Sequence, residues 1–170
     1  MVIPMKSFLI LVVLGIVTLG GCSTPEEPEL TAQRLMIDDL TKTPGFTWFV
    51  AEMNRFEPRP ELLPPITAAF QTASEKKVCI FVKASCSCRG TQRLFPQIVK
   101  TLLDANVPED RIEVWSMRTE QDRHPYEAMF KISALPSIYV IDNGIVRDSV
   151  QDYDYNESNA DSLIARAVVR

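Results

Sequence analysis

A continuous apolar run at residues 78–82 constrains the fold more than any other feature of the chain. It follows two lysines, and its length and β-branched residues predict a strand. Strands of this kind are buried on both faces and occur in sheets whose two faces are covered. The run therefore predicts an α/β domain with a central strand at this point.

The segments after this strand alternate between helical and extended patterns. Residues 91–105 carry apolar side chains at helical spacing, residues 120–131 predict a short helix, and Asn159 is expected to cap a final helix. Three segments have extended patterns: residues 112–117, 137–142 and 145–150. Asn143 and Gly144 predict a tight hairpin turn between the last two. This order predicts a mixed sheet of four strands with helices on both faces.

The N-terminus has the pattern of an export signal. Lys6 precedes a mostly apolar stretch at residues 8–17, which is too short to span a membrane and is followed by small residues. The sequence Leu-Gly-Gly-Cys at residues 19–22 resembles the lipobox of bacterial lipoproteins. The resemblance implies that residues 1–21 are a signal peptide and that Cys22 becomes the lipidated first residue of the mature chain.

Residues 22–30 are polar and proline-rich, which predicts an extended tether between membrane and domain. Acyl chains on Cys22 would anchor the chain stably, because each buried CH₂ contributes about 0.8 kcal/mol. We therefore expect a lipid-anchored protein in the bacterial cell envelope, on the periplasmic side. Ser23 after the lipidated cysteine resembles the pattern of sorting to the outer membrane.

Charge and composition limit the possible functions. The chain has 18 Lys and Arg against 22 Asp and Glu, a formal net charge of −4, which argues against a nucleic-acid partner. With 46% hydrophobic residues, it can form a core without disulfides. Of the four cysteines, Cys22 is assigned to lipid, which leaves three in an oxidising compartment. At least one thiol is therefore expected to be free or only transiently paired.

Two spacings connect these elements to a known family. Cys88 opens the predicted helix and Pro96 lies eight residues later, and Gly144 lies eight residues after Pro136. Together with the order of elements, these spacings resemble the thioredoxin family. The resemblance covers roughly residues 77–170.

The resemblance implies an α/β, thioredoxin-like fold for residues 76–170, with a central mixed four-stranded sheet flanked by helices. Residues 31–75 lie outside it and are expected to form an N-terminal helical extension. Helical patterns predict three helices in and next to this extension, at residues 30–40, 44–55 and 64–73.

Cys88 is the expected nucleophile, because the start of a helix stabilises a thiolate and lowers its pKa. Thr91 occupies the position of the second cysteine of the usual Cys-x-x-Cys motif. Cys86, in the loop before the helix, is the expected replacement, and a disulfide with Cys88 is possible but tight. In a rival register, Cys86 is the nucleophile and Cys88 its displaced partner. A loss of redox chemistry at both residues is the third possibility.

Leu135 and Pro136 are the expected substrate-binding residues. In the thioredoxin family the corresponding proline follows a cis peptide bond beside the nucleophile, and the backbone before it pairs with a substrate segment. The resemblance therefore implies thiol–disulfide exchange on exported proteins. It leaves the electron donor or acceptor unknown and requires no cofactor.

Two further functions remain open from the sequence. One is a redox-inactive binding module, which the Thr91 substitution favours. The other is copper handling by Cys86, Cys88 and His124, although His124 lies in a polar setting that predicts a solvated surface residue, and the expected site residues include no metal ligand. Cys79, inside the apolar run, is expected to be a core residue.

Overall fold

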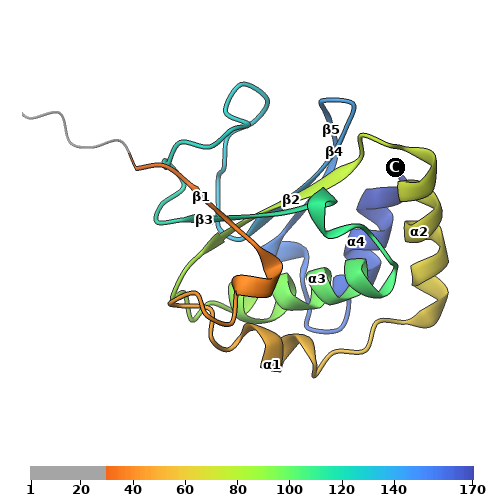
Figure 1. The fold of residues 1–170 in the computed structure, drawn as a ribbon, viewed down its shortest axis with the longest axis horizontal. Helices are drawn as coiled ribbons and strands as arrows, with labels where there is room; N and C mark the ends of the chain where they lie inside the picture. The colour runs from red at the N-terminus through yellow and green to blue at the C-terminus, as the bar shows by residue number, and fades with distance from the viewer. Residues whose placement is uncertain (1–29) are drawn as a thin grey trace, which may run out of the picture.

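The computed structural model describes residues 30–170 and contains one mixed sheet of five strands with helices packed against it (Figure 1). The strands are β1 (Gln33–Leu35), β2 (Lys77–Lys83), β3 (Ile112–Met117), β4 (Ser137–Asp142) and β5 (Ile145–Gln151). Their order across the sheet is β1-β3-β2-β4-β5. β2 and β3 are parallel, and the other neighbouring pairs are antiparallel. The predicted α/β class and mixed sheet are confirmed, but the sheet has five strands and not four.

The additional strand lies where the sequence predicted a helix at residues 30–40. β1 pairs with β3, with Leu35 opposite Val114, and only a 3₁₀ turn, η1 (Ile37–Asp39), follows it. Leu35 is buried, whereas Gln33 is exposed. The helical prediction is wrong because pairing covers the edge of β3, which would otherwise present unpaired backbone groups.

β2 is the central strand and carries the apolar run at residues 78–82, all of which are fully buried. Val78, Ile80 and Val82 belong to the core beneath the helices. Cys79 and Phe81 point to the other face and belong to a second, smaller core. The prediction of a strand buried on both faces is confirmed.

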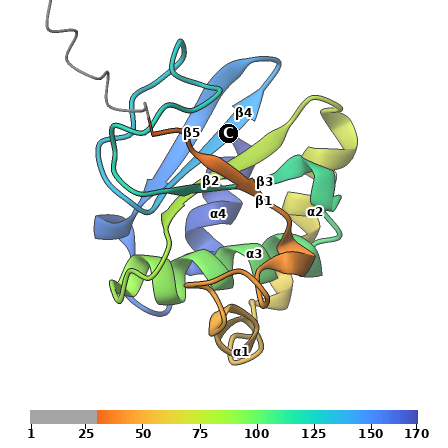
Figure 2. The same cartoon turned by 60° about the vertical axis from the view of Figure 1, so that its left-hand side comes forward.

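The helices gather on one side of the sheet, as the two views in Figures 1 and 2 show. The α-helices are α1 (Phe49–Met53), α2 (Leu63–Thr72), α3 (Phe95–Asp104) and α4 (Ala160–Val169). A π-helical turn, η3 (Gly90–Leu94), runs directly into α3, and short 3₁₀ turns are η2 (Pro60–Leu62), η4 (Glu109–Arg111) and η5 (Asp152–Asp154). The predicted helices at residues 64–73 and 91–105 are confirmed, as is a final helix after Asn159. The predicted helix at residues 44–55 shortens to α1.

The other face of the sheet is covered by the loop at residues 118–136, where the sequence predicted a helix at residues 120–131. This prediction is wrong, and so is that of helices on both faces. The carboxylate of Asp122 accepts hydrogen bonds from the backbone N–H groups of Arg118 and Thr119. The backbone of Arg123 pairs with the N-terminal segment through Ala32 N–H, at 2.7 Å. These contacts stabilise the loop in a non-helical conformation.

The hairpin between β4 and β5 follows its sequence signal. Asn143 and Gly144 both have positive φ, at 52° and 71°. This is the requirement of a type I′ turn, which matches the twist of the two strands. The predicted tight turn is confirmed.

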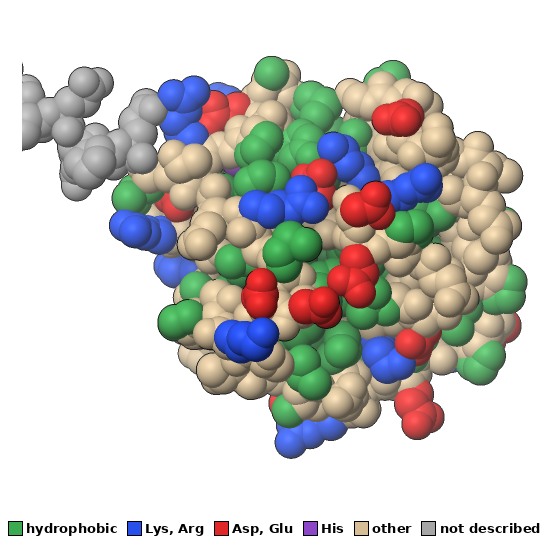
Figure 3. Space-filling model, viewed as in Figure 1, with side chains coloured by type: hydrophobic (Ala, Val, Ile, Leu, Met, Phe, Trp, Pro, Cys, Tyr) green, Lys and Arg blue, Asp and Glu red, His purple; other side chains and the backbone are tan. Residues whose placement is uncertain are grey.

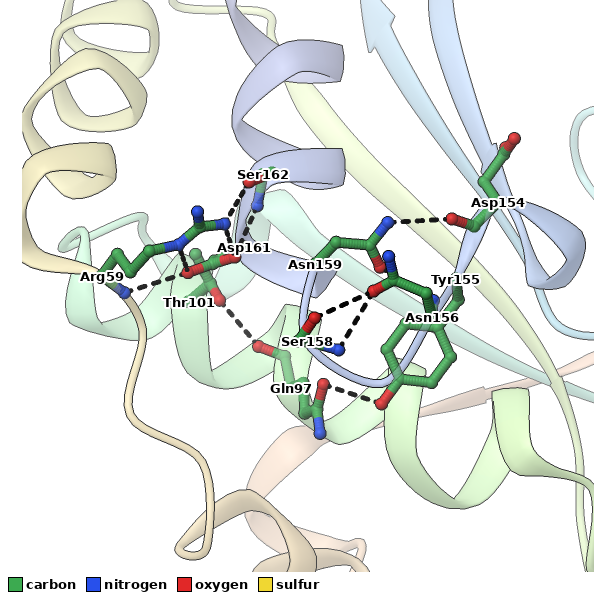
Figure 4. Close-up of polar contacts among 10 residues, drawn as sticks. All are labelled: Arg59, Gln97, Thr101, Asp154, Tyr155, Asn156, Ser158, Asn159, Asp161 and Ser162. Carbon is green, nitrogen blue, oxygen red and sulfur yellow. Dashed lines mark hydrogen bonds and ion pairs between the residues drawn. The ribbon is translucent and has the colours of Figure 1, made fainter.

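An ion pair between the buried carboxylate of Asp161 and the exposed Arg59 ties the N-terminal extension to α4 (Figure 4). The backbone N–H of Arg59 and two guanidinium nitrogens donate to the carboxylate of Asp161, at 3.0, 2.9 and 2.6 Å. Asp161 is only 2% exposed. Burial opposes its charge, but the hydrogen bonds from Arg59 outweigh this and hold the pKa of Asp161 below its ordinary value.

We expect Asp161→Asn to lower the free energy of unfolding at pH 7 by about 1–3 kcal/mol, because charge-assisted hydrogen bonds are lost. A carboxyl whose pKa is depressed in the folded state stabilises the fold above its unfolded pKa, near 4, and less as the pH falls. The difference in the free energy of unfolding between the variant and the parent chain should therefore become smaller toward pH 3. Urea unfolding at both pH values measures it.

Asp39→Asn is the matched control, because the Asp39–Lys42 ion pair is exposed. We expect it to change stability by less than about 1 kcal/mol. Equal effects of the two substitutions would contradict a stabilising role of the Arg59–Asp161 pair.

Candidate functional site

Cys86 and Cys88 are joined by a disulfide in the loop that follows β2. A turn brings them together: Ser85 has a φ of 58°, and the Cys86 N–H donates to the carbonyl of Lys83 at 3.4 Å. The two Cα atoms lie 5.3 Å apart, closer than in an extended chain and within the usual range for a disulfide. The sequence left open whether Cys86 and Cys88 form a disulfide, and the structure pairs them.

Cys88 lies directly before the helix formed by η3 and α3. Its carbonyl accepts the backbone N–H of Gln92 at 3.0 Å, and its own N–H donates to the sulfur of Cys86 at 3.2 Å. The side chain of Cys88 is half-buried. After reduction, the unpaired N–H groups and the partial positive charge of the helix start favour a thiolate at this position.

Thr91 contributes a polar contact that the sequence did not reveal. It is fully buried, and its hydroxyl oxygen lies 3.2 Å from the sulfur of Cys88, so that the hydroxyl can donate to it. A hydrogen bond to the charged form of a group lowers its pKa. Thr91 can therefore stabilise a thiolate at Cys88.

Pro96 explains why this helix begins with a π-helical turn. Proline has no N–H and cannot donate to the preceding turn. The Phe95 N–H donates instead to the carbonyl of Gly90, five residues back, and Pro96 is the second residue of α3. The helix next to Pro96 is therefore distorted into a widened turn.

The register of the sheet brings the proline loop to the cysteine loop. β2 and β4 are antiparallel, with Phe81 opposite Ser137. Residues just before β4 therefore lie beside the end of β2, where the cysteine loop begins. The Leu135–Pro136 peptide bond is cis, Pro136 is buried and Leu135 is half-buried. The neighbouring residues 133 and 134 are exposed, so this loop reaches the surface.

Gly90, at the start of η3, lies close against Pro136 of the proline loop. A Cβ at this position would lie 2.7 Å from both Cδ and Cγ of Pro136. Only glycine fits such an approach without displacing its neighbour. Gly90 is two residues after Cys88, so the contact places Cys88 and Pro136 in one site.

The helix that follows Cys88 is held by the loop before α4. Arg89 donates to the carbonyl of Tyr155 at 3.1 Å, and its guanidinium lies 5.5 Å from the centre of the tyrosine ring. The Tyr155 hydroxyl donates to Gln97 at 3.0 Å (Figure 4). Arg93 forms an exposed ion pair with Glu157 at 3.9 Å. These contacts fix the orientation of the helix relative to the disulfide.

Cys79 is a core residue, as predicted. It is fully buried and unpaired on the far face of β2, with its sulfur 3.7 Å from Oε2 of Glu113. Burial raises the pKa of Cys79 to about 12, so the thiol stays protonated at neutral pH. The expected unpaired thiol is therefore Cys79, and it is not a nucleophile.

His124 is not the solvated surface residue that the sequence predicted. It is 8% exposed, and its ring packs edge-on against Phe81 and stacks on Phe130. Burial lowers the pKa of His124, so the ring is neutral at neutral pH. Within residues 30–170, no three His, Cys, Asp or Glu side chains are grouped so that they could hold a metal ion.

The expected lipidation site, Cys22, lies outside the described residues, as do the signal peptide and all of the tether except Leu30. No helix within residues 30–170 has the length and hydrophobicity that a membrane crossing requires. No family model, curated protein or solved structure matches the chain. Its function is therefore inferred from the geometry of the site.

We expect Thr91→Val to raise the pKa of the reduced Cys88 thiol by about one to two units, because a hydrogen bond to a charged group contributes about 1.5–3 kcal/mol. Thiolate absorbance near 240 nm as a function of pH measures this. Thr101→Val is the control, because Thr101 is also fully buried but donates to the backbone of Gln97. Identical titration curves for the two variants would exclude a role of Thr91 in stabilising the thiolate.

Proposed function

We propose that the chain is a thioredoxin-like thiol–disulfide oxidoreductase that acts on exported polypeptides. One observation carries this proposal: the Cys86–Cys88 disulfide precedes a helix whose Gly90 touches a cis-proline. A reversible disulfide at a helix start is poised for exchange, because the thiolate is the reactive form of cysteine. The adjacent proline loop offers backbone to an extended substrate segment.

The order of elements supports a thioredoxin-like core. The parallel strands β2 and β3 are connected through the helix η3–α3, and the antiparallel pair β4–β5 leads into α4. On this interpretation β1, α1 and α2 are additions from the N-terminal extension. They cover the edge of β3 and part of the helical layer.

The reaction begins with the reduced form. The Cys88 thiolate attacks one sulfur of a substrate disulfide, forming a mixed disulfide and releasing a substrate thiolate, which takes up a proton. Cys86 then attacks the Cys88 sulfur and releases the second substrate thiol. The substrate gains two electrons and the chain ends with the Cys86–Cys88 disulfide. The reverse sequence oxidises a substrate dithiol, and a second thiol or disulfide partner resets the cycle.

Cys88 is the proposed nucleophile because the helix start and Thr91 both stabilise its thiolate. Cys86 is within bonding reach and serves as the resolving thiol. We expect Cys86→Ser to accumulate mixed disulfides with exported proteins, and Cys88→Ser to accumulate none. Non-reducing electrophoresis after acid quenching, followed by mass spectrometry, measures this.

Cys79→Ala is the control and should behave like the parent chain, because Cys79 is buried and unpaired. Mixed disulfides trapped through Cys86 in the Cys88→Ser variant would mean that Cys86 is the nucleophile and Cys88 the resolving thiol. If no variant traps a partner and the chain with both cysteines replaced keeps its cellular function, the protein is a redox-inactive binding module and the proposal is wrong.

We also propose that the protein is lipid-anchored in the cell envelope, on the basis of the lipobox-like sequence ending in Cys22. We expect the mature chain to incorporate labelled fatty acid and to partition into the detergent phase. Cys22→Ala should abolish both properties while the thiol-exchange reaction of the purified chain is unchanged. Detergent partitioning that survives this substitution would exclude Cys22 as the anchor.

A further inference from the structure

A cavity of about 640 Å³ opens at the end of the sheet where the parallel strands β2 and β3 have their C-terminal residues. Lys83 ends β2 and Met117 ends β3, and both line the cavity. Gln33 of β1 and the segment around Thr43 close its other sides. The cavity has the volume of a typical small-ligand site.

The cavity has an excess of positive charge. Lys42, Lys83 and Arg118 line it, against the single carboxylate of Asp39, which pairs with Lys42 at 3.4 Å. Lys83 and Arg118 are exposed, and neither has an ion-pair partner within the described part of the chain. The carboxylate of Asp122 attracts Arg118 from the neighbouring loop while it also accepts backbone N–H groups, so it offsets part of the charge of Arg118.

The excess of positive charge at this cavity contrasts with the charge of the rest of the molecule. The whole chain has a formal net charge of −4. On the face shown in Figure 3, acidic and basic side chains are interspersed among apolar ones. Three cations against one carboxylate in the lining of this cavity therefore favour a ligand with carboxylates.

The floor of the cavity is apolar. Leu35, Phe46 and Met117 line it and are nearly or fully buried. A ligand that fits must therefore present apolar side chains as well as negative charge. A peptide with Glu or Asp beside an apolar residue has both properties.

The cavity adjoins the disulfide loop. Ala84 lines the cavity and lies two residues before Cys86, a distance of at most about 7 Å along the chain. Gly45, next to the cavity-lining Pro44, is packed against the same loop: a Cβ on Gly45 would lie 2.7 Å from Oγ of Ser85. A residue close in sequence to a substrate cysteine is therefore within reach of the cavity when that cysteine reacts.

We infer that this cavity binds an acidic, partly apolar segment next to the reactive cysteine of the polypeptide substrate. The inference rests on the proposed thiol–disulfide exchange and adds a substrate class to it. Lys83 and Arg118 are the specificity-determining residues, because both are exposed cations that line the cavity. Neither residue takes part in the exchange of disulfides.

The test uses the full chain in detergent with Cys86→Ser and Cys88→Ser, so that binding is measured without redox chemistry. Two labelled peptides contain a serine in place of the reactive cysteine, flanked by leucine and by either Glu or Gln. We expect fluorescence anisotropy to give about tenfold tighter binding of the Glu peptide, weakening with added salt. Lys83→Gln with Arg118→Gln should abolish the preference.

Lys131→Gln with Arg166→Gln is the matched control, because it removes two exposed cations elsewhere and should keep the preference. Equal binding of the two peptides, or a preference that survives loss of Lys83 and Arg118, would overturn the inference. Turnover of a small uncharged disulfide by the chain with intact cysteines reports the proposed function separately. It should be unchanged by Lys131→Gln with Arg166→Gln and lost in Cys88→Ser.

Discussion

The contact between Gly90 and the ring of Pro136 is the constraint on which the candidate site depends. It holds the start of the η3–α3 helix against the beginning of β4. Because β4 is hydrogen-bonded to β2 in a fixed register, the loop after β2 is held at the same place. A cysteine next to this contact is therefore held in a fixed position relative to the proline loop.

Much of the fold follows from local sequence patterns. The central strand, the hairpin at Asn143 and Gly144, and the helix around Pro96 were predictable because their side-chain periodicity or turn residues determine them. The strand β1 and the loop at residues 118–136 were not. Both depend on pairing with distant segments: β1 with β3, and the Arg123 backbone with Ala32. Such tertiary contacts override a helical pattern in a short segment.

The candidate site was predictable in its cysteines and proline but not in the residues that support them. Spacing along the chain identified Cys88 and Pro136. The roles of Gly90 and Thr91 depend instead on three-dimensional contacts: the close approach of Pro136 to Gly90, and the distance between the Thr91 hydroxyl and the Cys88 sulfur. A glycine directly after the helix start was the available signal for close approach. His124 was misplaced because its polar sequence neighbours concealed an aromatic environment.

The position of Cys79 gives the protein an internal probe of its own folding. The thiol lies in the middle of the central strand, fully buried and unpaired. A thiol-reactive reagent can reach it only when β2 is exposed by an opening of the sheet. Its rate of modification therefore reports the free energy of that opening, independently of any chemistry at the surface cysteines.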